Sequence, residues 1–189
     1  LFNAINSKDI KKIFNLIDQD YFAKFLALSA LYNDNHPITG DNLKFIYDFT
    51  KGKFKVLYRQ ESGNIIPINT NIENFNNALF ESNISYKNAI SHDLFKLILS
   101  DKDFRFKRDT YLNQILNDKK NILKKAEETY NNAYKNLIYS DVKLRHQKYL
   151  KYNFFKVLNN NFDKTEEYLN YVKIYASNEK KEYLSKLFL

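Results

Sequence analysis

The glycines and prolines of this 189-residue chain are confined to one stretch. All three glycines and both prolines lie between Pro37 and Pro67, and the residues on either side contain neither type. Glycine and proline are the strongest signals for turns and loops, and both disfavour the interior of a helix. We therefore expect irregular backbone mainly in this stretch and helices in most of the remaining chain.

Polar side chains gather at the start of the same stretch. Four of them fall within nine residues: Asp34, His36, Asp41 and Asn42. The loop that carries them follows an apolar, helix-like run at residues 22–31 and precedes two strand-like runs. Acceptor side chains on a loop between regular elements are typical of phosphate and metal sites. The alternative is that these residues only cap helices and turns.

Two helices are predicted before this loop. Apolar residues at helical spacing predict the first over residues 7–17, with Ser7 as its N-cap. The second is expected over residues 21–32, capped by Asp18 or Asp20. Its apolar residues point to nearly every side, and a helix of that kind is normally buried. This helix should run through the core and hold the polar loop rigidly.

A β-hairpin is predicted after the loop, from strand-like runs at residues 43–48 and 53–58. Gly52 suits the positive φ at the end of the connecting turn. Residues 65–68 would add a third strand at the edge of the sheet, because Pro67 cannot donate to a ladder.

The open ends of an antiparallel hairpin lie side by side, so Asn42 and Glu61 are expected to converge on one ion. Lys53 and Arg59 lie near this point in the sequence and could hold phosphate. A solvated strand edge is the simpler interpretation of these two cations.

The rest of the chain is predicted to be helical. Five helical runs are expected: 74–81, 91–99, 101–116, 122–139 and 141–158. The asparagines at 159–161 should end the fifth run, and a last helix should begin at Asp163 or Thr165. The prediction is one mainly α domain with a small antiparallel β-sheet beside the polar loop.

The amino-acid composition limits the classes of protein to which this chain can belong. With 44% hydrophobic and 16% aromatic residues, the chain can form one substantial core. The absence of cysteine excludes disulfides and thiolate chemistry, and no apolar run approaches the ~20 residues that a membrane span needs. Because Met is absent and the chain starts at Leu1, we expect it to be part of a longer polypeptide.

The charge is positive and unevenly distributed. The net charge is +8. Residues 1–100 carry 11 basic and 10 acidic side chains, whereas residues 101–189 carry 19 basic and 12 acidic ones. A basic half could bind nucleic acid or an acidic partner. Acidic residues are interspersed throughout, which favours a solvated lysine-rich surface and argues against nucleic acid.

The order of several segments resembles a known family. The segments are YFAKFLALSALY at 21–32, a polar loop ending in DN at 41–42, LKFIYD at 43–48, TKGKFK at 50–55 and SHDLFKLILSDKDFRFKRDTYLNQIL at 91–116. In order and spacing they resemble the spore-coat protein H (CotH) kinases, which are atypical bacterial protein kinases. The resemblance covers residues 18–120. It implies a kinase-like large lobe at residues 1–120, with the small lobe and its ATP-clamping lysine upstream, and a helical extension at 121–189 packed on the same domain.

The resemblance also implies a reaction, namely transfer of a phosphoryl group from ATP, with Mg or Mn, to a Ser/Thr hydroxyl of a protein. Such chemistry needs oxygen ligands for the metal and a carboxylate that orients the hydroxyl. Asn42 matches the family's loop-ending asparagine, a metal ligand, and Glu61 would be a second ligand. Asp34 and Asp41 compete for the role of the orienting carboxylate, and His36 resembles the loop histidine.

The chain departs from the family pattern at two points. The aspartate that usually stands upstream of the asparagine would fall on Pro37, and the acidic motif after the hairpin corresponds to YRQES at 58–62, where Glu61 aligns only after a shift of one residue. The chain is therefore either an active kinase or a degenerate pseudokinase. The resemblance further implies a spore-coat or cell-surface location, with a protein substrate or a coat partner.

A second hypothesis is a non-catalytic helical module of a larger bacterial surface or coat protein. It would bind its partner through tyrosines, which are common at protein interfaces. These are Tyr130, Tyr134, Tyr149, Tyr152, Tyr168, Tyr171 and Tyr175. The simpler interpretation is that they fill the core of amphipathic helices.

Overall fold

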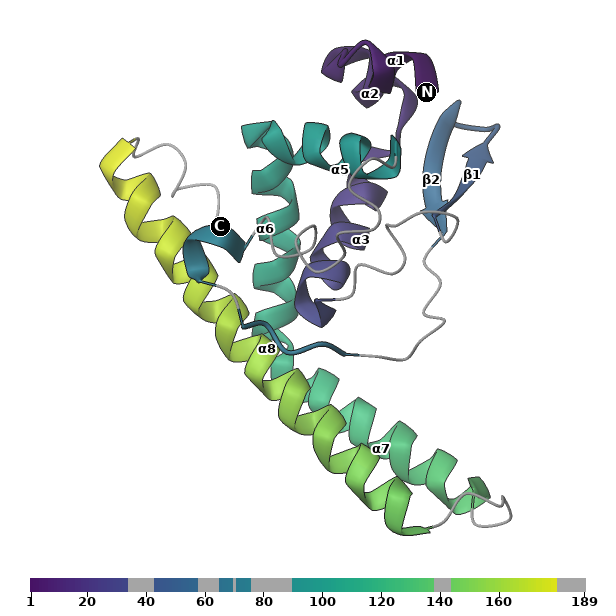
Figure 1. The fold of residues 1–189 in the computed structure, drawn as a ribbon, viewed down its shortest axis with the longest axis vertical. Coiled ribbons are helices and arrows are strands. Elements are labelled where there is room, and N and C mark those ends of the chain that lie inside the picture. The colour runs from purple at the N-terminus through teal and green to yellow at the C-terminus, as the bar shows by residue number, and fades with distance from the viewer. Residues whose placement is uncertain (34–42, 58–64, 70, 76–89, 138–143, 180–189) are drawn as a thin grey trace.

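The computed structural model describes residues 1–33, 43–57, 65–69, 71–75, 90–137 and 144–179. In these residues the chain is mostly helical, with one two-stranded antiparallel sheet beside the helices (Figure 1). This arrangement confirms the predicted mainly α fold with a small sheet.

Helix α3 (Gln19–Tyr32) is the central buried element. Its N-cap is Asp18, whose side chain accepts a hydrogen bond from the backbone N–H of Tyr21 at 3.1 Å, so Asp18 and not Asp20 caps the helix. Eight of its 14 residues are buried, as expected for a helix that is apolar on nearly every side. The helix ends at Tyr32, and its C-cap, Asn33, adopts the left-handed conformation with φ 49°.

The N-terminal residues form two short helices, α1 (Phe2–Asn6) and α2 (Ile10–Leu16). The single helix predicted from Ser7 is therefore wrong in its start. Ser7 lies at the end of α1, where its hydroxyl donates to the carbonyl of Ala4 at 3.2 Å. Asp9 is the N-cap of α2, because its carboxylate accepts a hydrogen bond from the N–H of Lys12 at 3.0 Å.

The predicted hairpin is confirmed by strands β1 (Lys44–Asp48) and β2 (Lys53–Leu57). The register runs from Lys44 opposite Leu57 to Asp48 opposite Lys53. Gly52 has φ +62° at the end of the turn, the conformation for which glycine was expected.

The predicted third strand is wrong. Residues 65–69 do not join the sheet, which has two strands within the described part of the chain. These residues instead form an extended segment, which we call the strap. The backbone N–H of Ile66 donates to the carbonyl of Tyr32 at 3.1 Å, and the amide of Asn33 donates to the carbonyl of Pro67 at 3.2 Å. Helix ends and side chains thus supply the hydrogen bonds that a neighbouring strand would have supplied.

The second half contains α5 (Ile90–Ser100), α6 (Lys102–Asn117), α7 (Lys119–Leu137) and α8 (Leu144–Glu179). Asp101 caps α6 as predicted, accepting a hydrogen bond from the N–H of Phe104 at 2.8 Å. Before these helices lies a short 3₁₀ turn, η3 (Ile72–Asn74). Most of the predicted helix 74–81 and the predicted restart at Asp141 lie outside the described residues.

Helix α8 runs without a break for 36 residues, so the predicted end at residues 159–161 is wrong. The polar side chains there bond to the helix or to the strap. Asn159 donates to the carbonyl of Phe155 at 2.8 Å, and Thr165 donates to that of Asn161 at 2.7 Å. Asn161 is fully buried, and its amide bonds to the strap.

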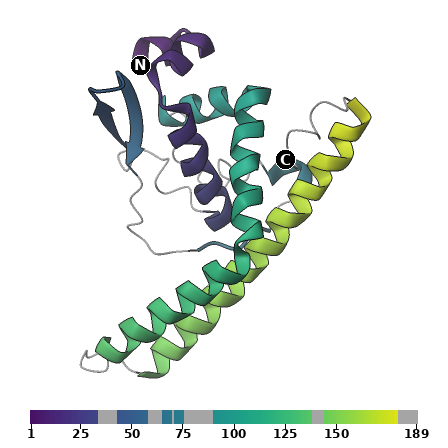
Figure 2. The same cartoon turned by 180° about the vertical axis from the view of Figure 1, so that it is seen from behind.

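Helix α6 packs between α3 and α8, and all three contribute to one hydrophobic core. Helix α7 and the first part of α8 run away from that core, as both cartoon views show (Figures 1 and 2). At the base of this projection, Lys119 Nζ forms an ion pair with Asp163 Oδ1 at 2.8 Å.

Candidate functional site

Most residues of the candidate site lie outside the described part of the chain. This holds for Asp34, His36, Asp41, Asn42, Arg59 and Glu61. The structure does describe the residues that flank them, and these set the positions at which the two polar segments attach to the fold.

Residues 34–42 connect the end of α3 to β1, and residues 58–64 connect β2 to the strap, so the two segments share their points of attachment. At one of them, Lys44 is paired with Leu57 across the hairpin; we call this the hairpin anchor. At the other, the strap is bonded to the end of α3, by Ile66 N–H to the Tyr32 carbonyl; we call this the strap anchor. The sequence that carries the polar residues therefore attaches to the fold as two segments with neighbouring ends.

The strap anchor is held from two sides. Asn161 Oδ1 accepts a hydrogen bond from the N–H of Ile68 at 2.9 Å, and Asn161 Nδ2 donates to the carbonyl of Ile66, also at 2.9 Å. The side chain of Ile68 is buried as well. Helix α8 and the C-terminal end of α3 thus fix the strap together, and with it the point at which residues 58–64 end.

Lys53 is the one candidate residue whose side chain is described. It stands at the turn end of β2, four residues from Leu57, which is about 13 Å at ~3.3 Å per residue. Its Nζ donates to the carbonyl of Asn15 at 2.5 Å. The structure therefore joins Lys53 to α2 and does not bring it to the hairpin anchor.

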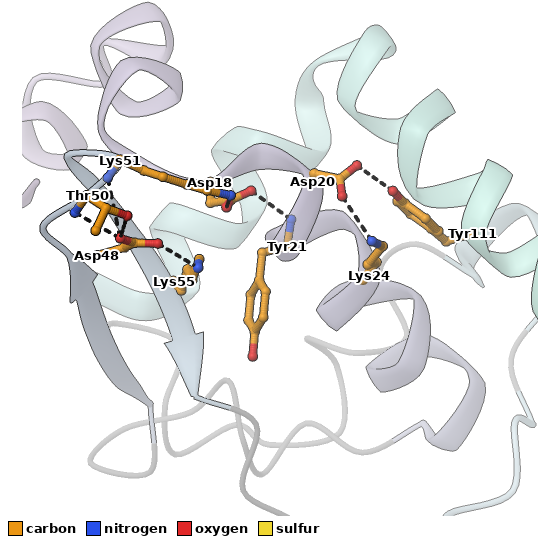
Figure 3. Close-up of polar contacts among 9 residues, drawn as sticks. All are labelled: Asp18, Asp20, Tyr21, Lys24, Asp48, Thr50, Lys51, Lys55 and Tyr111. Atoms are coloured by element: carbon orange, nitrogen blue, oxygen red, sulfur yellow. Dashed lines mark hydrogen bonds and ion pairs between the residues drawn. The ribbon is translucent and has the colours of Figure 1, made fainter.

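A polar cluster connects the hairpin to the start of α3 (Figure 3). Asp48 accepts hydrogen bonds from the hydroxyl of Thr50 at 2.6 Å, from the N–H of Thr50 at 3.0 Å and from Lys55 Nζ at 2.8 Å. Lys55 and Thr50 together hold the pKa of Asp48 well below its usual range. Lys51 Nζ lies 3.5 Å from Asp18 Oδ2. A carboxylate with this many hydrogen bonds is a poor proton acceptor. The cluster therefore has a structural role, in which it connects the hairpin to the start of α3.

A second polar cluster joins α3 to α6. The hydroxyl of Tyr111 donates to Asp20, and Lys24 Nζ lies 3.0 Å from the same carboxylate and 5.0 Å from the centre of the Tyr111 ring (Figure 3). The Tyr111 hydrogen bond lowers the pKa of Asp20. These side chains lie at the surface and connect two helices.

Sequence reasoning missed a buried polar triangle between α6 and α8. Arg108 Nε donates to Asp109 Oδ1 at 2.6 Å and Arg108 Nη2 to the hydroxyl of Tyr168 at 2.9 Å, while that hydroxyl donates to Asp109 Oδ2 at 3.1 Å. All three residues are buried, and Phe75 stacks on Tyr168 with ring centres 4.2 Å apart. Burial raises the pKa of Asp109, and the neighbouring guanidinium opposes that rise.

The sequence did contain one signal for this triangle. Arg108 lies in the segment at 91–116 that carries part of the resemblance to the kinase family. Its partner Tyr168 lies 60 residues away in the chain, so no local pattern connects the two.

Among the described side chains, no group of three or more His, Asp or Glu is placed to hold a metal ion. No helix in the described part of the chain combines the length and the apolarity needed to cross a membrane. Tyr168, one of the tyrosines considered as interface anchors, belongs to the core.

Comparison of the chain with protein-family models, with curated proteins and with solved structures finds no match, so the resemblance to the CotH kinases depends on the segments quoted above.

Proposed function

We propose that this chain is the larger part of a CotH-like kinase, which binds ATP with Mg or Mn and transfers a phosphoryl group to a Ser/Thr hydroxyl of a protein. One observation supports the proposal most. The two polar segments attach to the fold at shared anchors, Lys44 with Leu57 and Tyr32 with Ile66.

The roles of the residues follow from the chemistry of phosphoryl transfer. Asn42 lies two residues before Lys44, and Glu61 lies four residues after Leu57, so both are within a short reach of the hairpin anchor. In this proposal they hold the metal ion, for which amide and carboxylate oxygens are suitable ligands. Asp34 or Asp41 orients the attacking hydroxyl.

The remaining candidates have lesser roles. His36 belongs to the loop that carries the orienting carboxylate, and Arg59 neutralises phosphate charge. Lys53 stands at the end of β2 far from the hairpin anchor, and its Nζ lies 2.5 Å from the carbonyl of Asn15. The structure therefore gives no support to Lys53 as a phosphate ligand at the hairpin anchor. A degenerate form of the enzyme, with Glu61 as the only acid in residues 58–62, would bind the metal nucleotide without transferring phosphate.

Thermal unfolding with and without ATP and Mn²⁺ tests the proposal. At a ligand concentration of about 100 times Kd, binding stabilises the folded state by about 2.7 kcal/mol. For a chain of this size, that corresponds to a rise in Tm of roughly 5–10 °C. Mn²⁺ alone and ATP alone should each give a smaller shift than the two together.

Two substitutions at the metal site should abolish this rise, and two matched substitutions should not. Asn42→Ala and Glu61→Ala remove the proposed ligands. Asn132→Ala and Glu73→Ala remove the same chemical groups from exposed positions on α7 and η3. The proposal is rejected if the parent shows no shift while all four variants fold normally, or if all four variants keep the full shift.

A parent without any shift would favour the interaction module. The observation on its side is the projection of α7 and the first part of α8 away from the core (Figure 2). A surface of this kind is accessible to a partner on several sides.

A further inference from the structure

The β-hairpin carries an unusual share of the exposed apolar surface. In the described residues, eight large hydrophobic side chains are exposed, and four of them belong to the hairpin and its turn. These four are Ile46 at 49%, Tyr47 at 40%, Phe49 at 87% and Leu57 at 38% exposure. Single exposed apolar residues are normal on a protein surface, but a group on one small element indicates an interaction site.

The two edges of the sheet differ. The outer edge of β2 is occupied, because Ile17 forms a parallel bridge to Phe54 and the N–H of Asp18 donates to the carbonyl of Phe54 at 2.9 Å. No described strand pairs with the outer edge of β1, which lies at the periphery of the molecule in both views (Figures 1 and 2).

An open edge of this kind is normally protected. Proteins protect edges with charged side chains, prolines or bulges, because unpaired N–H and C=O groups attract other strands. In β1 the charged residues stand only at the two ends, Lys44 and Asp48, and the three central residues, Phe45, Ile46 and Tyr47, have none of these features.

The hairpin is also held rigidly, which lowers the entropy cost of binding. Val56 is completely buried, and Phe45 stacks on Phe22 of α3 with ring centres 6.3 Å apart. The Asp48 carboxylate fixes the turn, with three hydrogen bonds from Thr50 and Lys51. A strand that adds to β1 would therefore meet a preformed edge.

The charge around this edge selects the partner. Four lysines lie on the hairpin, at positions 44, 51, 53 and 55, against the two aspartates Asp48 and Asp18. Both aspartates are engaged with lysines of this set. Lys44 is exposed at the start of β1, and the side chain of Lys51 is 60% exposed in the turn that follows it. Within the described residues, the four lysines therefore exceed these two aspartates by two charges.

We propose that the outer edge of β1 binds an extended acidic segment of a partner protein, which adds to the sheet as a further strand. The main-chain groups of β1 would supply the hydrogen bonds, and Tyr47 would contact the apolar side chains that the added strand presents on the same face of the sheet, while Lys44 and Ile46 lie on the opposite face. The lysines would meet its acidic residues. This inference does not depend on the proposed kinase activity.

The test uses the whole chain and a fluorescein-labelled synthetic peptide of roughly eight alternating Glu and Val residues, somewhat longer than β1. Fluorescence anisotropy gives the affinity, and amide chemical shifts identify the residues contacted. We expect saturable binding with shift changes concentrated at residues 44–48. A Lys–Val peptide should not bind, because its charge is reversed, and a Glu–Pro peptide should not bind, because it cannot form a strand.

Two pairs of variants locate the contact. Lys44→Glu and Ile46→Glu should each weaken peptide binding roughly tenfold. Lys120→Glu and Ile174→Glu make the same changes at exposed positions on α7 and α8 and should change the affinity less than about twofold. Circular dichroism melts establish that all four variants are folded.

Several outcomes would overturn the proposal. One is that the Glu–Val peptide does not bind; another is that the Glu–Pro peptide binds equally well, which would mean that charge alone attracts it. Equal losses in both pairs of variants would show that the contact is not at β1. Dimerisation lost in the Ile46→Glu variant alone would assign the edge to a second copy of this chain. Binding of anionic vesicles in place of peptide would assign it to a membrane surface.

Discussion

The side-chain oxygen of Asn161 accepts a hydrogen bond from the backbone N–H of Ile68 at 2.9 Å, although the two residues are 93 positions apart in the chain. The same amide donates to the carbonyl of Ile66. One buried side chain on α8 therefore satisfies a donor and an acceptor of the strap, as a neighbouring strand would.

Replacing Asn161 by alanine should destabilise the protein by about 2–4 kcal/mol, because it leaves the buried N–H of Ile68 and the partly buried carbonyl of Ile66 without this partner, and an unpaired buried group costs about 1–3 kcal/mol. Urea denaturation measures the loss. Asn159→Ala is the matched control from the same run of asparagines, since it removes a bond to a carbonyl of its own helix and introduces a better helix former. Its effect should stay within about 0.5 kcal/mol. Equal costs for the two variants would contradict the role assigned to Asn161.

The Asp48 carboxylate predicts a pH dependence of stability. Lys55 and Thr50 depress its pKa in the folded state, so the unfolded chain takes up a proton first as the pH falls. The stabilising contribution is complete above the pKa of an unfolded Asp, about 3.9, and is lost as the pH falls from there toward the folded pKa. Asp48→Asn should therefore flatten the fall in stability between about pH 5 and pH 3.

Urea denaturation of the parent and the variant at a series of pH values measures this effect. Glu166→Gln, which removes an exposed carboxyl of α8, serves as the control. An acid limb as steep in Asp48→Asn as in the parent would mean that the Lys55 contact does not contribute in solution.

Local signals in the sequence predicted the hairpin and several helices, but they placed the first helix start wrongly at Ser7, and contacts between distant residues could not be predicted from them. Asp18 and Asp101 cap their helices as expected, because a helix cap depends on residues three positions apart. The strap was mistaken for a strand because its partners are the end of α3 and Asn161. Three consecutive asparagines suggested a helix end, but α8 continues through them, with Asn159 bonded to a carbonyl of the helix and Asn161 bonded to the strap.

The candidate site follows the same division. Its residue types and order were readable from the sequence, since Asp34, Asp41 and Asn42 fall within nine residues. Of the two anchors that flank this stretch, only one could be predicted from the sequence. The hairpin anchor follows from strand periodicity and Gly52, whereas the strap anchor depends on backbone contacts between Tyr32 and Ile66 that no sequence period encodes.

The loss of stability caused by substituting Gly52 can be predicted from its backbone conformation. Its φ of +62° lies in the left-handed region, and a Cβ built there would meet only the hydroxyl of Tyr47 at 3.7 Å, an ordinary contact. The cost of Gly52→Ala is therefore a backbone cost of about 1–2 kcal/mol. Gly52→Asn should cost less, because asparagine tolerates this conformation better. Urea denaturation of the two variants ranks them, and a larger loss for Asn would contradict the turn geometry.

The buried triangle of Arg108, Asp109 and Tyr168 allows a prediction about charge. Asp109→Asn leaves the guanidinium of Arg108 buried without its counter-charge, and removal of one partner of a buried ion pair typically costs about 3–5 kcal/mol. Tyr168→Phe removes only the hydroxyl that bridges the pair and should cost about 1–3 kcal/mol.

Removing both charges at once should be less harmful than removing one. In the double variant Arg108→Met with Asp109→Leu, no charge is buried, and such replacements are often neutral or stabilising. We therefore expect the double variant to be more stable than Asp109→Asn alone, and urea denaturation at pH 7 measures the difference. If the double variant is the less stable of the two, the triangle stabilises α6 against α8 through its hydrogen bonds, and the cost of burying its charges is smaller than that gain.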